Sequence, residues 1–199
     1  MTNIDSYNKI ALQWDENRKN RGIDPIIIDF SKMLPNSSHI LDIGCGSGYP
    51  IDEYLSSKGF KITGIDPSVN MISLAKAQNL KNANYYVDDL FSFETNDKYD
   101  AIIAFDSLFH ISLDKQEYIY EKVSSLIKTN GLFLFTHGKV ENTVTGNMFG
   151  EKFNYASLKK EKVISLLSAN NFKIIWLYED YKNDVTGERD LIILAKKAS

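Results

Sequence analysis

Short, almost continuously apolar segments alternate with helical patterns through most of this 199-residue chain. The apolar segments are rich in β-branched and aromatic residues, which favours strands over helices at this length. Seven strands are expected, at residues 39–43, 61–66, 84–87, 99–105, 131–137, 172–178 and 191–196. Strand–helix alternation with buried strands predicts an α/β fold, in which a mostly parallel sheet is covered by helices on both faces.

The last two expected strands are joined by a short polar segment that leaves no room for a helix. Because a parallel crossover needs about a dozen residues or more, this final pair should be antiparallel. We expect one domain over residues 1–199, with a helical lid at 1–30 and a substrate-side loop at 138–155. The second segment is polar, contains glycine and is long for a loop, which is typical of lids and binding segments.

A glycine-rich turn follows the first strand, in the stretch "ILDIGCGSGYP" at residues 40–50. Gly44, Gly46 and Gly48 allow positive φ and let the backbone approach a ligand closely. In open α/β sheets, ligands bind beyond the carboxyl ends of the strands. Asp66 ends the second strand, 22 residues after Gly44, where its carboxylate can accept hydrogen bonds from both ribose hydroxyls. The sequence therefore predicts a nucleoside-containing ligand.

The spacing of the glycines distinguishes between classes of nucleotide site. The dinucleotide fingerprint G-x-G-x-x-G has its third glycine where this chain has Tyr49. A phosphate-binding P-loop needs Lys and then Ser or Thr after its glycine, and this stretch has neither. A nicotinamide-dependent oxidoreductase on a Rossmann-type fold is kept as the alternative function.

Several motifs together resemble the class I S-adenosylmethionine-dependent methyltransferases. They are "LDIGCGSG", "GIDPS", "VDDLF", "YDAIIAFDSLFHI" and "GLFLFTHG", in that order along the chain. The overall pattern is similar to small bacterial methyltransferases of unassigned substrate. The resemblance implies a Rossmann-like, doubly wound, seven-stranded sheet of order 3-2-1-4-5-7-6, with an antiparallel last strand. It also implies S-adenosyl-L-methionine as cofactor and S-adenosyl-L-homocysteine as product.

The resemblance further implies roles for individual residues. The glycine turn approaches the methionine part of the cofactor, Asp66 holds the ribose, and either Asp88 or Asp89 faces the adenine. The N-terminal helix carries Tyr7 and Trp14, which either close over the cofactor or act as a structural brace. Cys45 is interpreted as a small filler within the turn. The cofactor-side residues are Tyr7, Trp14, Asp42, Gly44, Cys45, Gly46, Gly48, Asp66, Pro67, Ser68, Met71, Asp88, Asp89, Leu90 and Phe105.

Three residues are expected on the substrate side, namely Asp106, His110 and His137. A general base is needed only if the acceptor must lose a proton, and His110 is the candidate for that catalytic role. Whether N, O, S or C is methylated stays open. No pair of histidines has the spacing of metal ligands, so no metal is expected.

Composition limits the partners. The formal charge of −3 at pH 7 and the pI near 5.6 give no general attraction for nucleic acid or anionic membranes. A small-molecule acceptor is therefore expected, with a protein or nucleic-acid methyltransferase as the alternative. The single cysteine, and the lack of a signal pattern or a long apolar run, predict a cytoplasmic protein. A monomer or a homodimer is expected.

Overall fold

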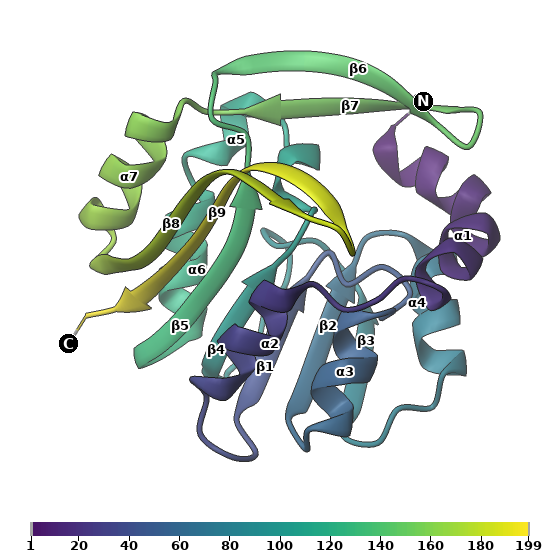
Figure 1. Cartoon of the computed structure of the whole chain (residues 1–199), viewed down its shortest axis with the longest axis horizontal. Helices are drawn as coiled ribbons and strands as arrows, with labels where there is room; N and C mark the ends of the chain where they lie inside the picture. Colours follow the sequence, from purple (N-terminus) through teal and green to yellow (C-terminus); the bar gives the residue numbers. More distant parts are fainter. Residues whose placement is uncertain (1, 199) are drawn as a thin grey trace.

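The computed structural model describes residues 2–198, and its central feature is a seven-stranded sheet of order β3-β2-β1-β4-β5-β9-β8. Strands β1 to β5 are parallel, whereas β9 runs antiparallel to both β5 and β8 (Figure 1). The expected strand order and the antiparallel final pair are confirmed. The strands are β1 (His39–Ile43), β2 (Lys61–Asp66), β3 (Ala83–Val87), β4 (Tyr99–Ala104), β5 (Ile127–His137), β8 (Phe172–Asn183) and β9 (Gly187–Lys197).

Alternating side chains along the central strands supply two separate cores. In β1, Ile40 faces a core shared with α2 and α3, whereas Leu41 faces a core shared with α6 and α7. Both side chains are fully buried. A strand buried on both faces reads as a continuous apolar run, which is why the strands were visible in the sequence.

The helices that cover the sheet are positioned by recognisable caps. Ser68 begins α4 by accepting from the Met71 N–H, and Asp24 begins α2 by accepting from the Ile26 N–H, with proline at the next position. None of the helices within residues 2–198 has the length and apolar character needed to cross a membrane. The helices are α1 (Asn3–Lys19), α2 (Pro25–Lys32), α3 (Ile51–Ser57), α4 (Val69–Ala77), the 3₁₀ turn η1 (Leu108–His110), α5 (Leu113–Gln116), α6 (Ile119–Leu126) and α7 (Lys160–Ala169).

The segment expected as an N-terminal helical lid at 1–30 divides into two helices with different surroundings. Helix α1 packs against α4 and β7, beyond the carboxyl ends of the strands (Figure 1). Helix α2 buries Ile27 and Phe30 completely in the core beside the sheet. The lid expectation was therefore too wide, because α2 is part of the packed domain and only α1 stands at the open edge.

The segment expected as a loop at 138–155 is instead a β-hairpin. Strands β6 (Asn142–Met148) and β7 (Glu151–Ser157) form their own two-stranded sheet above the end of the main sheet (Figure 1). Phe149 and Gly150 connect them, with φ of 49° and 84°. Two successive residues of positive φ match the twist of a tight hairpin. The prediction was wrong because phenylalanine at such a position gives no sequence signal for this turn.

Candidate functional site

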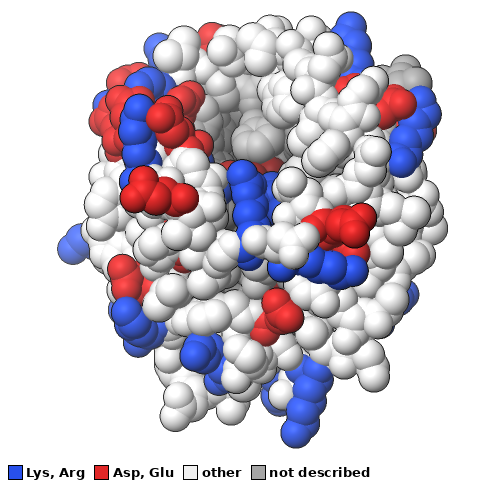
Figure 2. All heavy atoms as spheres, turned by 45° about the vertical axis from the view of Figure 1, so that its right-hand side comes forward, with Lys and Arg blue, Asp and Glu red and all other residues white. Residues whose placement is uncertain are grey.

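A large cavity lies at the carboxyl ends of the parallel strands, with a volume of about 890 Å³. Its walls come from the glycine turn, the ends of β2 and β4, helix α1 and the β6–β7 hairpin. Figure 2 shows a deep hollow on this side of the molecule, bordered mostly by uncharged side chains, with basic side chains at its lower edge. The predicted site residues that line the cavity are Tyr7, Trp14, Asp42, Gly44, Cys45, Gly46, Asp66, Pro67, Ser68, Met71, Asp88, Asp89, Leu90, Phe105, Asp106 and His110.

Two predicted residues do not line this cavity. Gly48 lies behind the turn, where an added Cβ would come within 3.0 Å of the Tyr85 hydroxyl. His137 is buried and lines a second cavity of about 550 Å³, which shares Asp106 and His110 with the first. The structure therefore brings 16 of the predicted residues together and places Gly48 and His137 just outside the group.

Gly44 and Gly46 adopt positive φ in different surroundings. Gly44 has φ of 76°, and a Cβ there would lie 2.4 Å from the Ser107 Cβ. Gly46 has φ of 56°, and its Cβ position meets only the Trp14 indole nitrogen, at 3.5 Å. Gly44 is therefore required by the packing of β1 against the end of β4. At Gly46 the turn is open toward the cavity and the face of α1.

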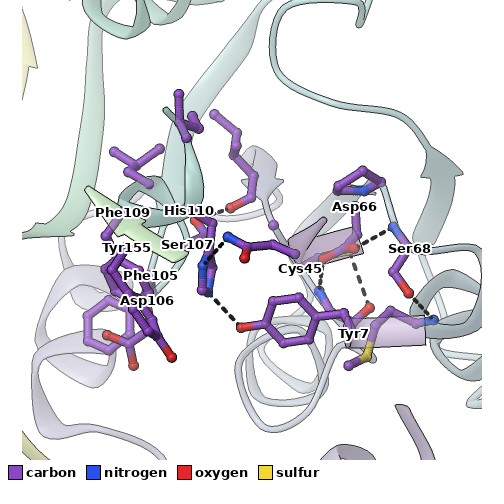
Figure 3. A pocket seen from close by; sticks show the side chains of 18 of the residues that line it. Tyr7, Cys45, Asp66, Ser68, Phe105, Asp106, Ser107, Phe109, His110 and Tyr155 are labelled. Atoms are coloured by element: carbon purple, nitrogen blue, oxygen red, sulfur yellow. Dashed lines mark hydrogen bonds between the residues drawn. The ribbon is translucent and has the colours of Figure 1, made fainter. Parts of the chain in front are cut away.

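Asp66 ties the end of β2 to the glycine turn. One carboxylate oxygen accepts from the Gly46 N–H over 3.0 Å, and the other accepts from the Ser68 N–H over 2.8 Å (Figure 3). Burial raises the pKa of Asp66 to about 6, and these two backbone donors oppose the increase. Each carboxylate oxygen retains a free lone pair. Asp66 can therefore accept further hydrogen bonds from a ligand in the cavity.

Beneath the turn lie two more buried acidic groups. Burial and the neighbouring Asp52 raise the pKa of Asp42 well above its usual range, and burial raises the pKa of Asp52 to about 7. Burial also raises the pKa of the Cys45 thiol, helped by the surrounding carboxyl groups. A thiol in such surroundings stays protonated and is a poor nucleophile, which supports the interpretation of Cys45 as a filler.

The two aspartates after β3 shape a tight turn at the cavity wall. Asp89 accepts from the Phe91 N–H over 2.8 Å, and Asp88 accepts from the Asp89 N–H over 2.9 Å. Burial alone would raise the pKa of Asp89, but the hydrogen bonds from Phe91 and Ser92 outweigh it and the pKa is lowered. Both aspartates line the cavity, so which of them faces the adenine stays a prediction.

Helix α1 is fastened over the cavity from two sides. On one side, Asn8 accepts from the Ser68 hydroxyl over 2.8 Å at the start of α4. On the other side, Ser6 donates to the Lys152 carbonyl of β7 over 2.7 Å. Between these contacts, the Tyr7 and Trp14 rings meet edge to face with centroids 5.6 Å apart. Both predicted aromatic residues thus face the cavity in a closed arrangement.

His110 is the most heavily engaged side chain of the substrate side. Its Nε2 lies 2.8 Å from the Tyr7 hydroxyl, and its Nδ1 lies 3.0 Å from the Asn3 side-chain nitrogen (Figure 3). Phe109 and Tyr155 pack against the ring. Burial lowers the pKa of His110 to about 4. The imidazole is therefore neutral at pH 7, and both of its nitrogens have partners.

Asp106 faces the boundary between the two cavities from a strained backbone position, with φ of 57°. Arg189 of β9 donates to both of its carboxylate oxygens, over 2.8 and 2.7 Å. The same arginine reaches the buried Asp24 over 3.2 Å and lies above the Phe105 ring at 4.5 Å. Asp106 thus forms a bidentate ion pair with Arg189, and its negative charge is balanced before any ligand binds.

Sequence reasoning missed Asn3, Arg18 and Arg189 as site residues. Arg18 lines both cavities, and its guanidinium lies 4.1 Å from the Trp14 ring centroid. Within residues 2–198, the guanidinium makes no hydrogen bond or ion pair. Burial lowers the pKa of Arg18 to about 10, so it stays charged at pH 7. A signal was available, because Arg18 follows Trp14 by four positions on the same helical face.

Comparisons with known proteins agree with this geometry. A family described as "Methyltransferase domain" matches residues 40–131. A ubiquinone biosynthesis O-methyltransferase from Coxiella burnetii is 30% identical over 152 residues, which cover 73% of this chain and 60% of that protein. A carboxy-S-adenosyl-L-methionine synthase from Campylobacter fetus is 30% identical over 115 residues, 56% of this chain and 49% of that protein. The chain thus spans about half to three-fifths of the length of these relatives.

Solved structures share the fold. A SAM-dependent methyltransferase from Methanosarcina mazei is 24% identical with a TM-score of 0.72, covering 88% of this chain and 98% of that one. The magnesium protoporphyrin IX methyltransferase of Synechocystis PCC 6803, with bound SAH, is 16% identical with a TM-score of 0.73, covering 98% and 97%. Residues 40–131 thus match the methyltransferase domain family, and the chain as a whole shares the fold of S-adenosylmethionine-dependent methyltransferases.

Proposed function

We propose that this protein transfers a methyl group from S-adenosylmethionine to a small-molecule acceptor. The observation that carries the proposal is the meeting of the glycine turn and Asp66 at one cavity, joined by the 3.0 Å bond from the Gly46 N–H. Two acceptor oxygens beside an open backbone turn suit a ribose and the chain attached to it. A nicotinamide-dependent oxidoreductase is not favoured, because Tyr49 stands at the third glycine position of its fingerprint.

The residues present fit this cofactor. Asp66 would accept from the ribose hydroxyls, and the turn between Asp88 and Leu90 would border the adenine. The Arg18 guanidinium lines the cavity over the Trp14 ring and makes no ion pair within residues 2–198, and we assign it to the methionine carboxylate. When bound, the cofactor supplies a methyl group already activated by a sulfonium. Tyr7 and Trp14 offer aromatic faces to that cation.

The acceptor would occupy the rest of the enclosed space. The main cavity of about 890 Å³ stands near the upper end of the roughly 300–1,000 Å³ typical of small-molecule sites, and the second cavity adds about 550 Å³. Phe109, Tyr155 and Val144 give this side an aromatic and apolar wall. Among the relatives, the ubiquinone biosynthesis enzyme and the protoporphyrin enzyme are named for small-molecule substrates.

In this proposal, α1 acts as a lid and the β6–β7 hairpin as the acceptor-side wall. Both elements contact each other through Ser6 and Lys152, so the cavity is covered when they meet. Exclusion of water strengthens electrostatic interactions at the reacting atoms. We further propose a cytoplasmic location, in keeping with the single buried cysteine.

Calorimetry with S-adenosylmethionine, S-adenosylhomocysteine and NAD tests the cofactor. We expect the first two to bind and NAD not to bind. Binding of NAD without binding of S-adenosylhomocysteine would refute the proposal. A pooled-metabolite screen that detects release of S-adenosylhomocysteine then identifies the acceptor.

A further inference from the structure

The Asn3 side-chain amide is oriented by the backbone of the hairpin. Its nitrogen donates to the Asn154 carbonyl over 2.7 Å, and its oxygen accepts from the Asn154 N–H over 2.8 Å. A backbone N–H can only donate and a carbonyl can only accept, so the pair fixes which end of the amide carries the hydrogens. One hydrogen of the amide nitrogen is used on Asn154, and the other is available to His110 Nδ1 at 3.0 Å.

This orientation determines the tautomer of His110. Because Asn3 donates to Nδ1, that nitrogen must be the unprotonated one, and the neutral ring carries its hydrogen on Nε2. Nε2 then donates to the Tyr7 hydroxyl oxygen over 2.8 Å. The Asn154 carbonyl also lies 3.3 Å from Nδ1, where it would favour the opposite tautomer. The Asn3 contact is shorter and opposes that arrangement.

The surroundings keep the ring neutral. Burial lowers the pKa of His110 to about 4, and the Asn154 carbonyl and the Asp106 carboxylate oppose the decrease. The other titratable groups that face the ring are Tyr7 and Tyr155, and burial raises the pKa of both hydroxyls. At pH 7 the ring and both tyrosines are therefore uncharged.

We propose that Asn3 is a positioning residue that fixes His110 as an Nε2–H donor to Tyr7, so that the Tyr7 hydroxyl hydrogen is the polar group presented to an oxyanion methyl acceptor. In this arrangement Nε2 carries a hydrogen and the lone pair of Nδ1 accepts from Asn3, so His110 has no free lone pair with which to remove a proton. Tyr7 accepts from His110 and retains its own hydrogen, for which residues 2–198 offer no acceptor. The identity of the acceptor class rests on the proposed methyltransferase function, whereas the tautomer does not.

The chemistry of the acceptor follows from the direction of this hydrogen bond, in which the Tyr7 hydroxyl is the donor. A carboxylate or phenolate oxygen has more than one lone pair, so it can accept from Tyr7 and still attack the methyl carbon. The attacking pair forms the new carbon–oxygen bond, and the pair of the broken carbon–sulfur bond stays on sulfur. The negative charge of the acceptor and the positive charge of the sulfonium cancel, and no proton is released. A neutral amine has one lone pair and cannot serve both contacts.

Long-range ¹H–¹⁵N correlation spectra of the labelled full-length protein at pH 7 read out the tautomer directly. His137 provides an internal reference, because its Nδ1 lies 2.7 Å from the Gly138 carbonyl and must carry its hydrogen there. We expect His110 to show the opposite pattern, with the hydrogen on Nε2. A His110 ring protonated on Nδ1 in the wild-type protein would overturn the proposal.

Two variants distinguish positioning of the His110 ring by Asn3 from a general role of Asn3 in attaching α1 to β7. Asn3→Ala should lose most of the Nε2–H signal of His110, as the hydrogen moves to Nδ1 and toward the Asn154 carbonyl. Ser6→Ala removes a different bond between α1 and β7, to the Lys152 carbonyl, and should leave the tautomer unchanged. An unchanged spectrum in Asn3→Ala, or an equal loss in Ser6→Ala, would contradict the role of Asn3.

Benzoate and benzylamine test the acceptor class in the same spectra, with S-adenosylhomocysteine present. Benzoate should shift the His110 Nε2–H signal, and the shift should disappear in Tyr7→Phe. Benzylamine should leave the signal in place. Absence of a benzoate shift, or an equal shift with benzylamine, would overturn the acceptor class. Failure of S-adenosylhomocysteine to bind would instead count against the proposed function. The tautomer of His110 is tested separately, because it is measured in the protein without ligand.

Discussion

Replacement of Asp66 by alanine tests the cofactor site at its most defined point. The carboxylate is almost fully enclosed at the end of β2 and already accepts from the Gly46 and Ser68 N–H groups. Alanine preserves the strand and removes both acceptor oxygens. We expect Asp66→Ala to remain folded and to bind S-adenosylhomocysteine much more weakly than the wild-type protein.

The effect on stability is a balance of opposing contributions. Burial raises the pKa of Asp66 from 3.8 to about 6, so the native state holds this proton more tightly than the unfolded chain. Ionisation of Asp66 therefore destabilises the folded state. The free energy of unfolding falls by about 3 kcal/mol in all as the pH rises from about 4 to 6. Alanine removes that cost, but it leaves two N–H groups without acceptors, at about 1–3 kcal/mol each. The free energy of unfolding should change by less than about 3 kcal/mol.

The effect on affinity has no such compensation. Hydrogen bonds from ribose hydroxyls to a charged carboxylate contribute about 1.5–3 kcal/mol. Their loss should raise the dissociation constant roughly tenfold to hundredfold. Calorimetry measures this on the folded variant, with Asp29→Ala as control, because Asp29 lies on α2 and is paired with the exposed Lys32. Wild-type affinity in folded Asp66→Ala would refute the ribose assignment.

Four further outcomes are expected. Gly44→Ala should lower the melting temperature and abolish binding, because its Cβ would lie 2.4 Å from that of Ser107. Arg18→Gln should weaken S-adenosylhomocysteine roughly tenfold or more but leave adenosine binding unchanged in calorimetry, since adenosine has no carboxylate. Affinity for S-adenosylhomocysteine should fall below about pH 6, where Asp66 becomes protonated, as a pH series of titrations would measure. Hydrogen exchange across residues 3–19 should slow with ligand, and unchanged exchange would argue against a lid.

The strands were predictable because their burial leaves a direct trace in the sequence. Leu132 to Phe135 and Leu191 to Ala195 are buried on both faces, and such segments stand out as apolar runs. Helix α2 was included in the expected helical lid and not recognised as a separate helix, although Asp24 and Pro25 form a typical helix start. Its eight residues are too few for a clear periodic pattern. The hairpin was overlooked because Phe149 occupies a positive-φ turn position without an Asn-Gly or Asp-Gly signal.

The same contrast divides the candidate site. The cofactor side is made by turns that directly follow strands, so Gly44, Gly46 and Asp66 could be assigned from their order along the chain. The acceptor side is made by contacts between distant segments, such as Asn3 with Asn154 and Asp24 with Arg189. A single sequence contains no local pattern that links such pairs.

This difference in construction predicts where the protein can change. The glycine turn and Asp66 are coupled to the packing of β1, β2 and β4, so substitutions there disturb fold and cofactor together. The Asn3–His110–Tyr7 contacts join α1 and η1, and the bonds between Asn3 and Asn154 connect them to β7 at the edge of the domain. A substitution in that group can alter which acceptor is held while the sheet and the cofactor turn stay intact. Acceptor choice should therefore respond to changes in the Asn3–His110–Tyr7 group and the hairpin, whereas cofactor affinity should respond to changes at the strand ends and at Arg18.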